Sequence, residues 1–212
     1  MIVAIEGGLG SGKTCLLTKY AVESYLLQGR KVYSNYHLKR IPYTKLDIVD
    51  IYLNQPELKN VFIAGDELHT FMDCRLSQKR RNIIESYFVL QTRKKNVDLY
   101  FTSQWLNLVD IRLIRFVDVV IRMHKIYITN EDGIKMVHPY LFLAEFHDYR
   151  EDFIPDVYTK IFDGRKWFDH YDTNEVIYPP DDYLRTEKEI KEKERTKNGK
   201  KKKIRKEDKL QE

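Results

Sequence analysis

The residues with the clearest chemistry lie in one glycine-rich stretch, residues 7–14, which reads Gly-Gly-Leu-Gly-Ser-Gly-Lys-Thr. Its spacing matches G-x-x-x-x-G-K-[ST] at every fixed position. Glycines let successive backbone N–H groups converge on phosphate oxygens, and a following helix points its positive end at the same place. We expect Lys13 to reach the β- and γ-phosphates of ATP and the Thr14 hydroxyl to bind Mg²⁺. The expected nucleotide contacts are the loop and the next residue: Gly7, Gly8, Leu9, Gly10, Ser11, Gly12, Lys13, Thr14 and Cys15.

Two acidic residues follow an apolar run farther along the chain. Val61 to Gly65 is the length of a buried strand, and Asp66 and Glu67 come directly after it. We expect Asp66 to hold the Mg²⁺ and Glu67 to polarise a water molecule for attack on the γ-phosphate. A nucleotide kinase transfers the phosphoryl group to a second substrate and has less use for such a glutamate. The pair therefore favours hydrolysis, with a kinase as the alternative.

Two further polar residues complete the predicted catalytic set. Gln104 ends the next apolar run, where its amide would reach the γ-phosphate or the attacking water. Arg93 lies near the end of a predicted helix, and an arginine there would stabilise transition-state charge, often across a subunit interface in ring ATPases. The pattern also fits a basic residue that completes a helix C-terminus. Four other arginines remain alternatives for the catalytic one: Arg75, Arg81, Arg112 and Arg115.

The pattern of apolar residues predicts the elements that position these groups. Strands alternate with helices at a spacing typical of an α/β protein with a mostly parallel central sheet and helices on both faces. Strands are expected at residues 2–5, 31–36, 61–65, 97–102 and 116–123. Helices are expected at residues 13–28, with Gly29 as the stop, at 50–53, at 77–95 and within 105–115.

The remainder of the chain has a different pattern. Residues 126–129 and 134–137 flank Asn-Glu-Asp-Gly, which predicts a β-hairpin, and residues 140–147 read as one more strand. Residues 149–180 are rich in Tyr, Asp and Pro, and we expect them to wrap the domain with little regular structure. The predicted organisation is an ATPase core at 1–125, a hairpin and irregular extension at 126–182, and a basic, largely disordered tail at 183–212.

Composition narrows the class of protein. The 212 residues carry a formal net charge of +5, with 37 Lys and Arg against 32 Asp and Glu. Residues 185–212 alone hold 13 of the basic and 7 of the acidic residues, so the basic character lies in the tail. Cys15 and Cys74 predict no disulfide framework, and the histidines show no zinc spacing. The first strand begins at once and no apolar stretch approaches ~20 residues, so we expect a protein of the cytoplasm without a signal peptide or transmembrane segment.

Taken together, these motifs resemble the FtsK/HerA branch of P-loop ATPases over the first ~125 residues. Two groups within that branch are most similar: genome-packaging ATPases of viruses with internal membranes, and zonular occludens toxin-like assembly ATPases of filamentous phages. The toxin-like proteins usually carry a transmembrane helix after the ATPase domain, and none is expected here. The resemblance is carried by residues 7–14, Asp66 with Glu67, Gln-x-Arg93, Thr-Ser-Gln104, residues 29–35 and residues 171–173.

The resemblance implies a fold of the extra-strand, RecA/FtsK-like type and an ATP-hydrolysing DNA translocase, in particular a viral packaging motor. It further implies a homo-oligomeric ring, a hexamer or a pentamer, that binds double-stranded DNA through its phosphates. Candidate DNA contacts are residues 79–81, Lys94, Lys95 and the tail lysines, each of which also fits a solvated surface. The alternative is a virion assembly or export ATPase that acts on a capsid or membrane protein partner.

Overall fold

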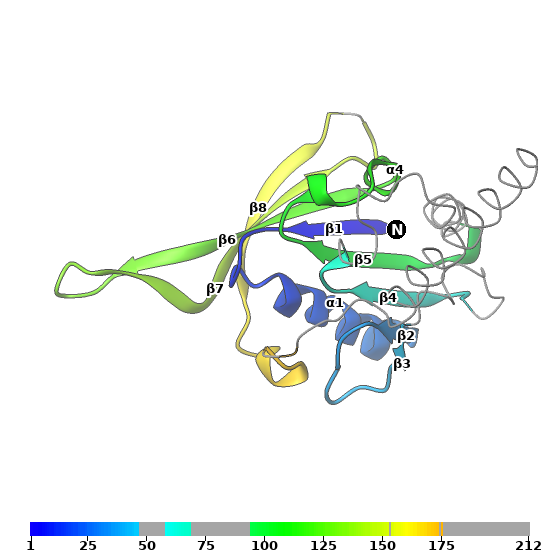
Figure 1. Ribbon diagram of the computed structural model, residues 1–212, viewed down its shortest axis with the longest axis horizontal. Coiled ribbons are helices and arrows are strands. Elements are labelled where there is room, and N and C mark those ends of the chain that lie inside the picture. The colour runs from blue at the N-terminus through cyan, green and yellow to red at the C-terminus, as the bar shows by residue number, and fades with distance from the viewer. Residues whose placement is uncertain (47–57, 69–93, 153, 174, 176–212) are drawn as a thin grey trace, which may run out of the picture. The chain divides into compact units, whose positions relative to one another are not determined.

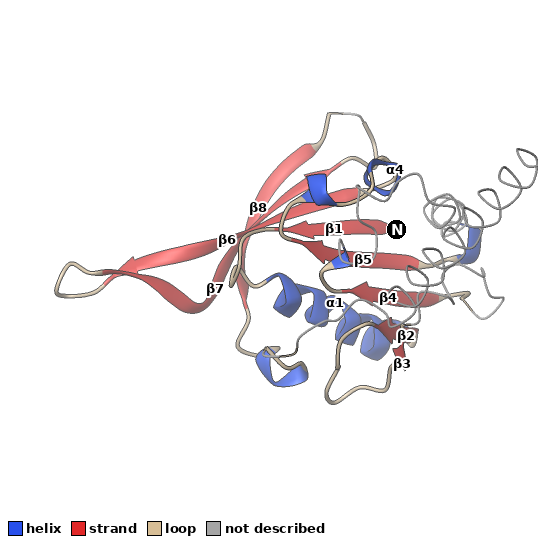
Figure 2. Cartoon of the chain, in the orientation of Figure 1, coloured by secondary structure: helices blue, strands red, loops and turns tan. Residues whose placement is uncertain are grey.

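The structure is a computed structural model that describes residues 1–46, 58–68, 94–152, 154–173 and 175. Its main feature is an eight-stranded sheet with the order β3-β2-β4-β5-β1-β6-β7-β8 (Figures 1 and 2). The strands are β1 (Ile2–Glu6), β2 (Lys31–Ser34), β3 (Thr44–Lys45), β4 (Val61–Gly65), β5 (Asp98–Ser103), β6 (Val119–Thr129), β7 (Lys135–Asp148) and β8 (Asp156–Asp163). The helices are α1 (Lys13–Gln28) and α4 (Ile111–Ile114), with 3-10 turns η3 (Leu106–Leu108) and η4 (Phe168–His170).

The sheet is parallel from β3 to β6 and antiparallel from β6 to β8, which confirms the expected mostly parallel α/β sheet. β5 lies between β1 and β4, and pairs Ala4 with Phe101 on one side and Ala64 with Tyr100 on the other. Carboxyl ends of neighbouring parallel strands meet at one edge of a sheet. This register therefore brings together the residues that follow β1, β4 and β5.

Helix α1 has the bounds expected from the sequence. It ends at Gly29, whose left-handed backbone (φ 61°) lets its N–H donate to the Tyr25 carbonyl at 3.1 Å. Its apolar side packs on one face of the sheet, where Leu17 and Ile5 are fully buried in the same core. Residues of η3 and α4 lie in a second core with the alternate side chains of β1 on the opposite face. β1 is thus covered on both faces, which explains its continuous apolar run.

The carboxy-terminal strands differ from the expectation in two respects. Separately expected strands are merged: 116–123 and 126–129 form β6, so the expected boundary after residue 125 falls inside an element, and 134–137 and 140–147 form β7. The expectation of little regular structure across 149–180 is wrong for β8, which pairs with β7 along its whole length. The side chains of β8 explain why it forms: Tyr158 stacks on Phe146 with ring centroids 4.8 Å apart, and Phe162 packs on Phe142.

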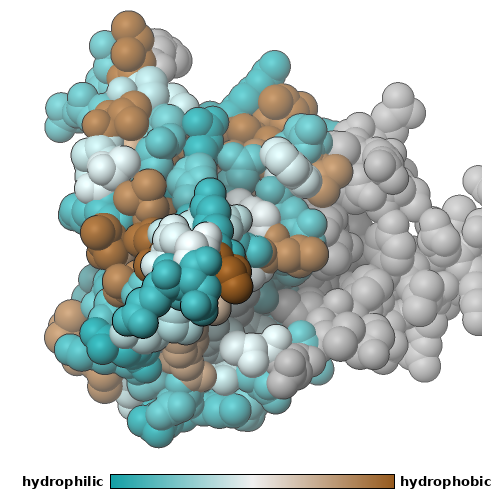
Figure 3. Space-filling view, turned by 90° about the vertical axis from the view of Figure 1, so that its left-hand side faces the viewer, coloured by the Kyte–Doolittle hydropathy of each residue, from teal (hydrophilic) through white to brown (hydrophobic). Residues whose placement is uncertain are grey.

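The distal halves of β6 and β7 extend beyond the rest of the sheet (Figure 1). Their turn is closed by Asn130, whose side chain accepts from the Ile134 N–H at 2.7 Å and whose carbonyl accepts from Gly133. Figure 3 views the molecule from this side and shows apolar patches scattered among hydrophilic residues. Exposed apolar side chains here are Tyr127, Ile128, Ile134, Met136 and Val137.

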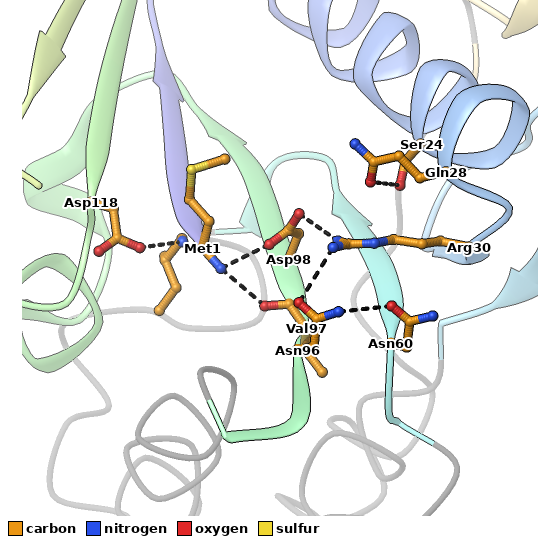
Figure 4. A network of polar contacts seen from close by, with 10 residues as sticks. Met1, Ser24, Gln28, Arg30, Asn60, Asn96, Val97, Asp98 and Asp118 are labelled. Atoms are coloured by element: carbon orange, nitrogen blue, oxygen red, sulfur yellow. Dashed lines mark hydrogen bonds and ion pairs between the residues drawn. The ribbon is translucent and has the colours of Figure 1, made fainter.

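Polar contacts join the elements at the edge of the sheet opposite the glycine loop (Figure 4). Asp98 accepts from the Arg30 guanidinium at 2.5 Å and from the Met1 amino group at 2.8 Å, and Asp118 accepts from the Ile2 N–H at 2.7 Å. Arg30 comes two residues after the last residue of α1, so its ion pair with Asp98 at the start of β5 fixes the end of the helix against the sheet. No helix within the described ranges is both long and apolar enough to cross a bilayer.

Some of the sequence-based expectations fall outside the described residues. They are the helix at 50–53, the helix at 77–95 apart from Lys94 and Lys95, Cys74, Arg75, residues 79–81, Arg93 and the tail beyond residue 175.

Candidate nucleotide-binding site

The glycine loop between β1 and α1 is shaped by close packing against the neighbouring strands. A Cβ at Gly12 would lie 2.8 Å from the ring of Phe142 on β7, and the φ of Gly12 is +86°. A Cβ at Gly7 would lie 2.5 Å from the carbonyl oxygen of Met123 on β6. Since neither position has room for a side chain, glycine is required at both. The root of the β6–β7 hairpin thus helps to hold the loop in place.

The amino end of α1 is open to an anion. Gly12 caps the helix without a side-chain hydrogen bond, and the first turn holds no acidic residue. The buried Ser11 hydroxyl has no hydrogen-bond partner among the described residues. The N–H groups of a first helical turn have no partner within the helix, and together with the helix dipole and the Ser11 hydroxyl they suit phosphate oxygens. The residues present therefore fit a polyphosphate.

Lys13 is buried at the same end of the helix, with 5% of its surface exposed. Its ammonium donates to the carbonyl of Gly8 at 3.2 Å, which folds the side chain back over the loop. The ammonium also lies 4.0 Å from a carboxylate oxygen of Glu67. A buried ammonium attracts negative charge strongly, because its desolvation is only partly offset by these two contacts. Lys13 is thus placed to contact bound phosphates.

Asp66 lies at the carboxyl end of β4, opposite the start of α1. Its carboxylate accepts from the Thr14 hydroxyl at 3.1 and 3.2 Å and from the Thr102 hydroxyl at 2.5 Å. Burial, helped by the nearby charge of Glu67, raises the pKa of Asp66 to about 6. A divalent cation beside the carboxylate would favour its charged form. Thr14 and Asp66 therefore form an oxygen pair suited to Mg²⁺.

Two residues that the sequence reasoning did not assign fix the end of β4. The side chain of Asn35, just after β2, donates to the Asp66 carbonyl at 2.8 Å and accepts from the Asp66 N–H at 2.7 Å. The Thr102 hydroxyl accepts from the Glu67 N–H at 2.8 Å. Glu67 has a φ of +48°, a left-handed conformation that non-glycine residues rarely adopt. These bonds hold the acidic pair in place despite that strain.

Residues 9–15, Asp66, Glu67 and Gln104 of the predicted set line one cavity of about 520 Å³, whereas Gly7 and Gly8 do not line it. Gln104 contributes to its wall together with Asp66 and Glu67, so the residues that follow β1, β4 and β5 converge on this cavity. Of the arginine alternatives, Arg112 pairs with Asp110 at 3.2 Å, and Arg115 lines a different cavity. Arg93, Arg75 and Arg81 lie outside the described residues.

The cavity has a further wall that the sequence reasoning did not assign to the site. It comes from a segment that we name the return segment, residues 164–173 with Glu175. The members that line the cavity are Tyr171, Asp172, Thr173 and Glu175. Burial raises the pKa of the Cys15 thiol to about 12, and the thiol lies 3.6 Å from the carbonyl of Gly164. Cys15 is thus a packing residue between α1 and the return segment.

No protein-family model matches the chain, and no curated protein sequence matches it. Solved structures do match in fold. The N-terminal domain of zonular occludens toxin from Neisseria meningitidis matches with a TM-score of 0.58 and 19% identity, over 81% of this chain and 98% of that one. The genome packaging NTPase B204 of Sulfolobus turreted icosahedral virus 2, in complex with ATP-gammaS, matches with a TM-score of 0.51 and 13% identity, over 76% and 96%. The chain is therefore similar in fold to P-loop ATPases.

Proposed function

We propose that this protein is a Mg²⁺-dependent ATPase that transfers the γ-phosphate of ATP to water. One observation carries the proposal: Lys13, Thr14, Asp66, Glu67 and Gln104 line a single cavity at the carboxyl ends of three adjacent parallel strands. A phosphate-binding loop, a cation site and a carboxylate are the parts that nucleotide hydrolysis requires. The B204 structure with ATP-gammaS supports ATP as the nucleotide.

Each residue has a role set by its position. The loop N–H groups and the Lys13 ammonium bind the phosphates, and Thr14 and Asp66 hold the cation. A Mg²⁺ held there would supply positive charge that offsets the charge of the phosphates. Glu67 accepts a proton from the attacking water while Gln104 orients it, as the bond between the γ-phosphorus and the bridging oxygen breaks. The buried position of Asp66 and Lys13 strengthens these electrostatic contacts.

The order of strands supports assignment to the extra-strand, RecA/FtsK-like type of P-loop fold. In that type an additional strand lies between the loop strand and the strand with the acidic pair. Here β5 occupies that place, and Gln104 directly follows its last residue, Ser103. This order supports a role for the Gln104 amide beside the γ-phosphate.

We further propose that hydrolysis drives translocation of double-stranded DNA, in particular for packaging of a viral genome, by a homo-oligomeric ring of six or five subunits. The similarity in fold to the B204 packaging NTPase supports this function. Lys94 and Lys95 are the described members of the proposed DNA contacts, and Lys94 is exposed. Arg93 would complete the active site of a neighbouring subunit.

A second candidate function is virion assembly or export, with a capsid or membrane protein as partner. One observation favours it: the zonular occludens toxin domain matches with a higher TM-score than B204 and is covered almost completely. An assembly ATPase would use the same hydrolytic site without a groove for DNA. The exposed apolar side chains of the β6–β7 hairpin would suit a protein partner.

The experiment that tests these functions is ATP hydrolysis measured with and without duplex DNA at low salt, together with oligomeric mass. Stimulation by DNA that disappears at high salt supports the translocase. ATPase activity that is the same with and without DNA, together with co-purification of a coat or membrane protein, supports the assembly role. Release of inorganic phosphate from ATP alone excludes a kinase, and absence of any phosphate release contradicts the ATPase itself.

A further inference from the structure

The cavity beside the glycine loop has two chemically different sides. Thr14 faces Asp66, whereas the next residue, Cys15, faces Gly164 of the return segment. Successive residues of a helix point about 100° apart, so the start of α1 separates the two sides. In Figure 1 the return segment lies below the start of α1, and the carboxyl ends of β4 and β5 lie above it.

The return segment is held in place by backbone contacts with the chain that follows β2. The N–H of Lys39 donates to the carbonyl of His170 at 2.6 Å, and Leu38 forms an isolated antiparallel bridge with Tyr171. The carboxylate of Glu175 accepts from the N–H of His37 at 2.7 Å. Tyr171 is buried in the core that α1 also joins. The cavity wall on this side is therefore preformed.

A triphosphate bound along the loop has only one orientation that serves hydrolysis. Its γ-phosphate must lie beside Glu67 and Gln104, which places the α-phosphate and the nucleoside toward the return segment. The cavity of about 520 Å³ falls within the usual range for a whole small-molecule ligand.

The polar groups on this wall match the donors of a ribose. Asp172 and Thr173 are exposed and line the cavity. An ionised carboxylate only accepts hydrogen bonds, and a threonine hydroxyl can accept them too. We propose that the return segment is the nucleoside-binding half of the site, with Asp172 and Thr173 accepting hydrogen bonds from the ribose hydroxyls. This inference rests on the proposed function, because it requires a bound nucleotide.

The test compares three ligands by equilibrium titration with Mg²⁺: ATP, 2′,3′-dideoxy-ATP and inorganic tripolyphosphate. The double variant Asp172→Ala/Thr173→Val should bind ATP about tenfold or more weakly, as loss of charge-assisted hydrogen bonds predicts. Its affinities for tripolyphosphate and for dideoxy-ATP should equal those of the wild type, since neither ligand carries the ribose hydroxyls. Both substituted residues are exposed, so the folded state should be retained.

A matched control is Asp169→Ala, which removes another exposed aspartate of the return segment that pairs with Arg40 at 3.2 Å and does not line the cavity. It should leave all three affinities unchanged. The proposal is overturned if the double variant binds ATP normally, or if its affinities for ATP and tripolyphosphate fall together. Lys13→Ala should weaken the binding of both ATP and tripolyphosphate. A wild-type protein that binds neither ligand would contradict the proposed function as well.

Discussion

The side chain of Asn35 hydrogen-bonds both backbone polar groups of Asp66, donating to its carbonyl at 2.8 Å and accepting from its N–H at 2.7 Å. This pair joins the end of β2 to the end of β4, two neighbouring strands of the sheet. The backbone of Asp66 is thus fixed independently of its carboxylate. That leaves the carboxylate free to serve Thr14, Thr102 and a cation.

Replacement of this asparagine should separate binding from catalysis. Asn35→Ala removes two hydrogen bonds from the backbone of Asp66 and should cost about 1–3 kcal/mol of unfolding free energy. We expect kcat for ATP to fall at least tenfold, with only a small change in affinity for a non-hydrolysable ATP analogue, because the phosphate loop is not touched. Steady-state kinetics and titration of the analogue measure the two effects.

The matched control for that variant is Asn107→Ala, since Asn107 is an exposed asparagine in η3 outside the cavity. Its kinetic constants should equal those of the wild type. An Asn35→Ala protein with unchanged kcat would show that the position of Asp66 does not depend on this contact.

Glu67 allows a sharper test of the hydrolytic step. Glu67→Gln keeps the size of the side chain and removes its capacity to accept a proton, so ATP should bind while kcat falls about 10²–10⁴-fold. The measurement is a single-turnover assay beside a binding titration. Normal turnover in this variant would eliminate Glu67 as the base.

How well the sequence predicted each element depended on how local its determinants are. Helix α1 and strand β4 have the predicted bounds because consecutive residues carry both the apolar pattern and the glycine that ends it. Strand β8 was missed since its stacking partners lie on β7 and most of its residues are exposed, which leaves little hydrophobic signal. Its content of β-branched and aromatic residues, which are common in strands, was an available sign.

The residues of the candidate site also divide into those set by local sequence and those set by contacts between distant residues. The roles expected of Lys13 and Thr14 followed from a contiguous motif, and the structure places both at the cavity. The contacts of Asn35 and Thr102 with Asp66 span 31 and 36 residues, and no spacing rule connects such positions. The return segment is farther still from the loop in sequence. Its place in the site depends on the folded path of β7 and β8.

The role proposed for Arg93 predicts a defect that depends on assembly. Arg93→Ala should bind nucleotide normally and lose most of its ATPase activity as an oligomer, because a transition-state arginine contributes about 10³-fold or more to rate. Mixing it with Lys13→Ala subunits should restore part of the activity, since some interfaces then combine an intact loop with an intact arginine. Failure of mixed oligomers to regain activity would place the arginine in its own subunit or remove it from the mechanism.

Burial of the Asp66 carboxylate should destabilise the folded protein at neutral pH when no cation is bound beside it. Its pKa is raised from 3.8 to about 6 in the folded protein, mainly by burial. The folded state therefore binds more protons than the unfolded state between these values, and its stability falls as the pH rises through this window. The shift corresponds to about 3 kcal/mol at neutral pH. Asp66→Asn, which keeps an acceptor for the two threonines, should lack this loss.

The measurement is unfolding free energy by denaturant titration in metal-free buffer from pH 4 to pH 7.5, for the wild type and for Asp66→Asn. As the pH rises, the unfolding free energy of the wild type should fall relative to that of Asp66→Asn. Addition of Mg²⁺ with an ATP analogue should raise the unfolding free energy of the wild type much more than that of the variant. Comparing the two proteins cancels the titration of all other carboxylates. A difference that stays constant with pH would mean that the Asp66 carboxylate is already compensated by Thr14, Thr102 and Lys13, and that the cation is not needed to relieve it.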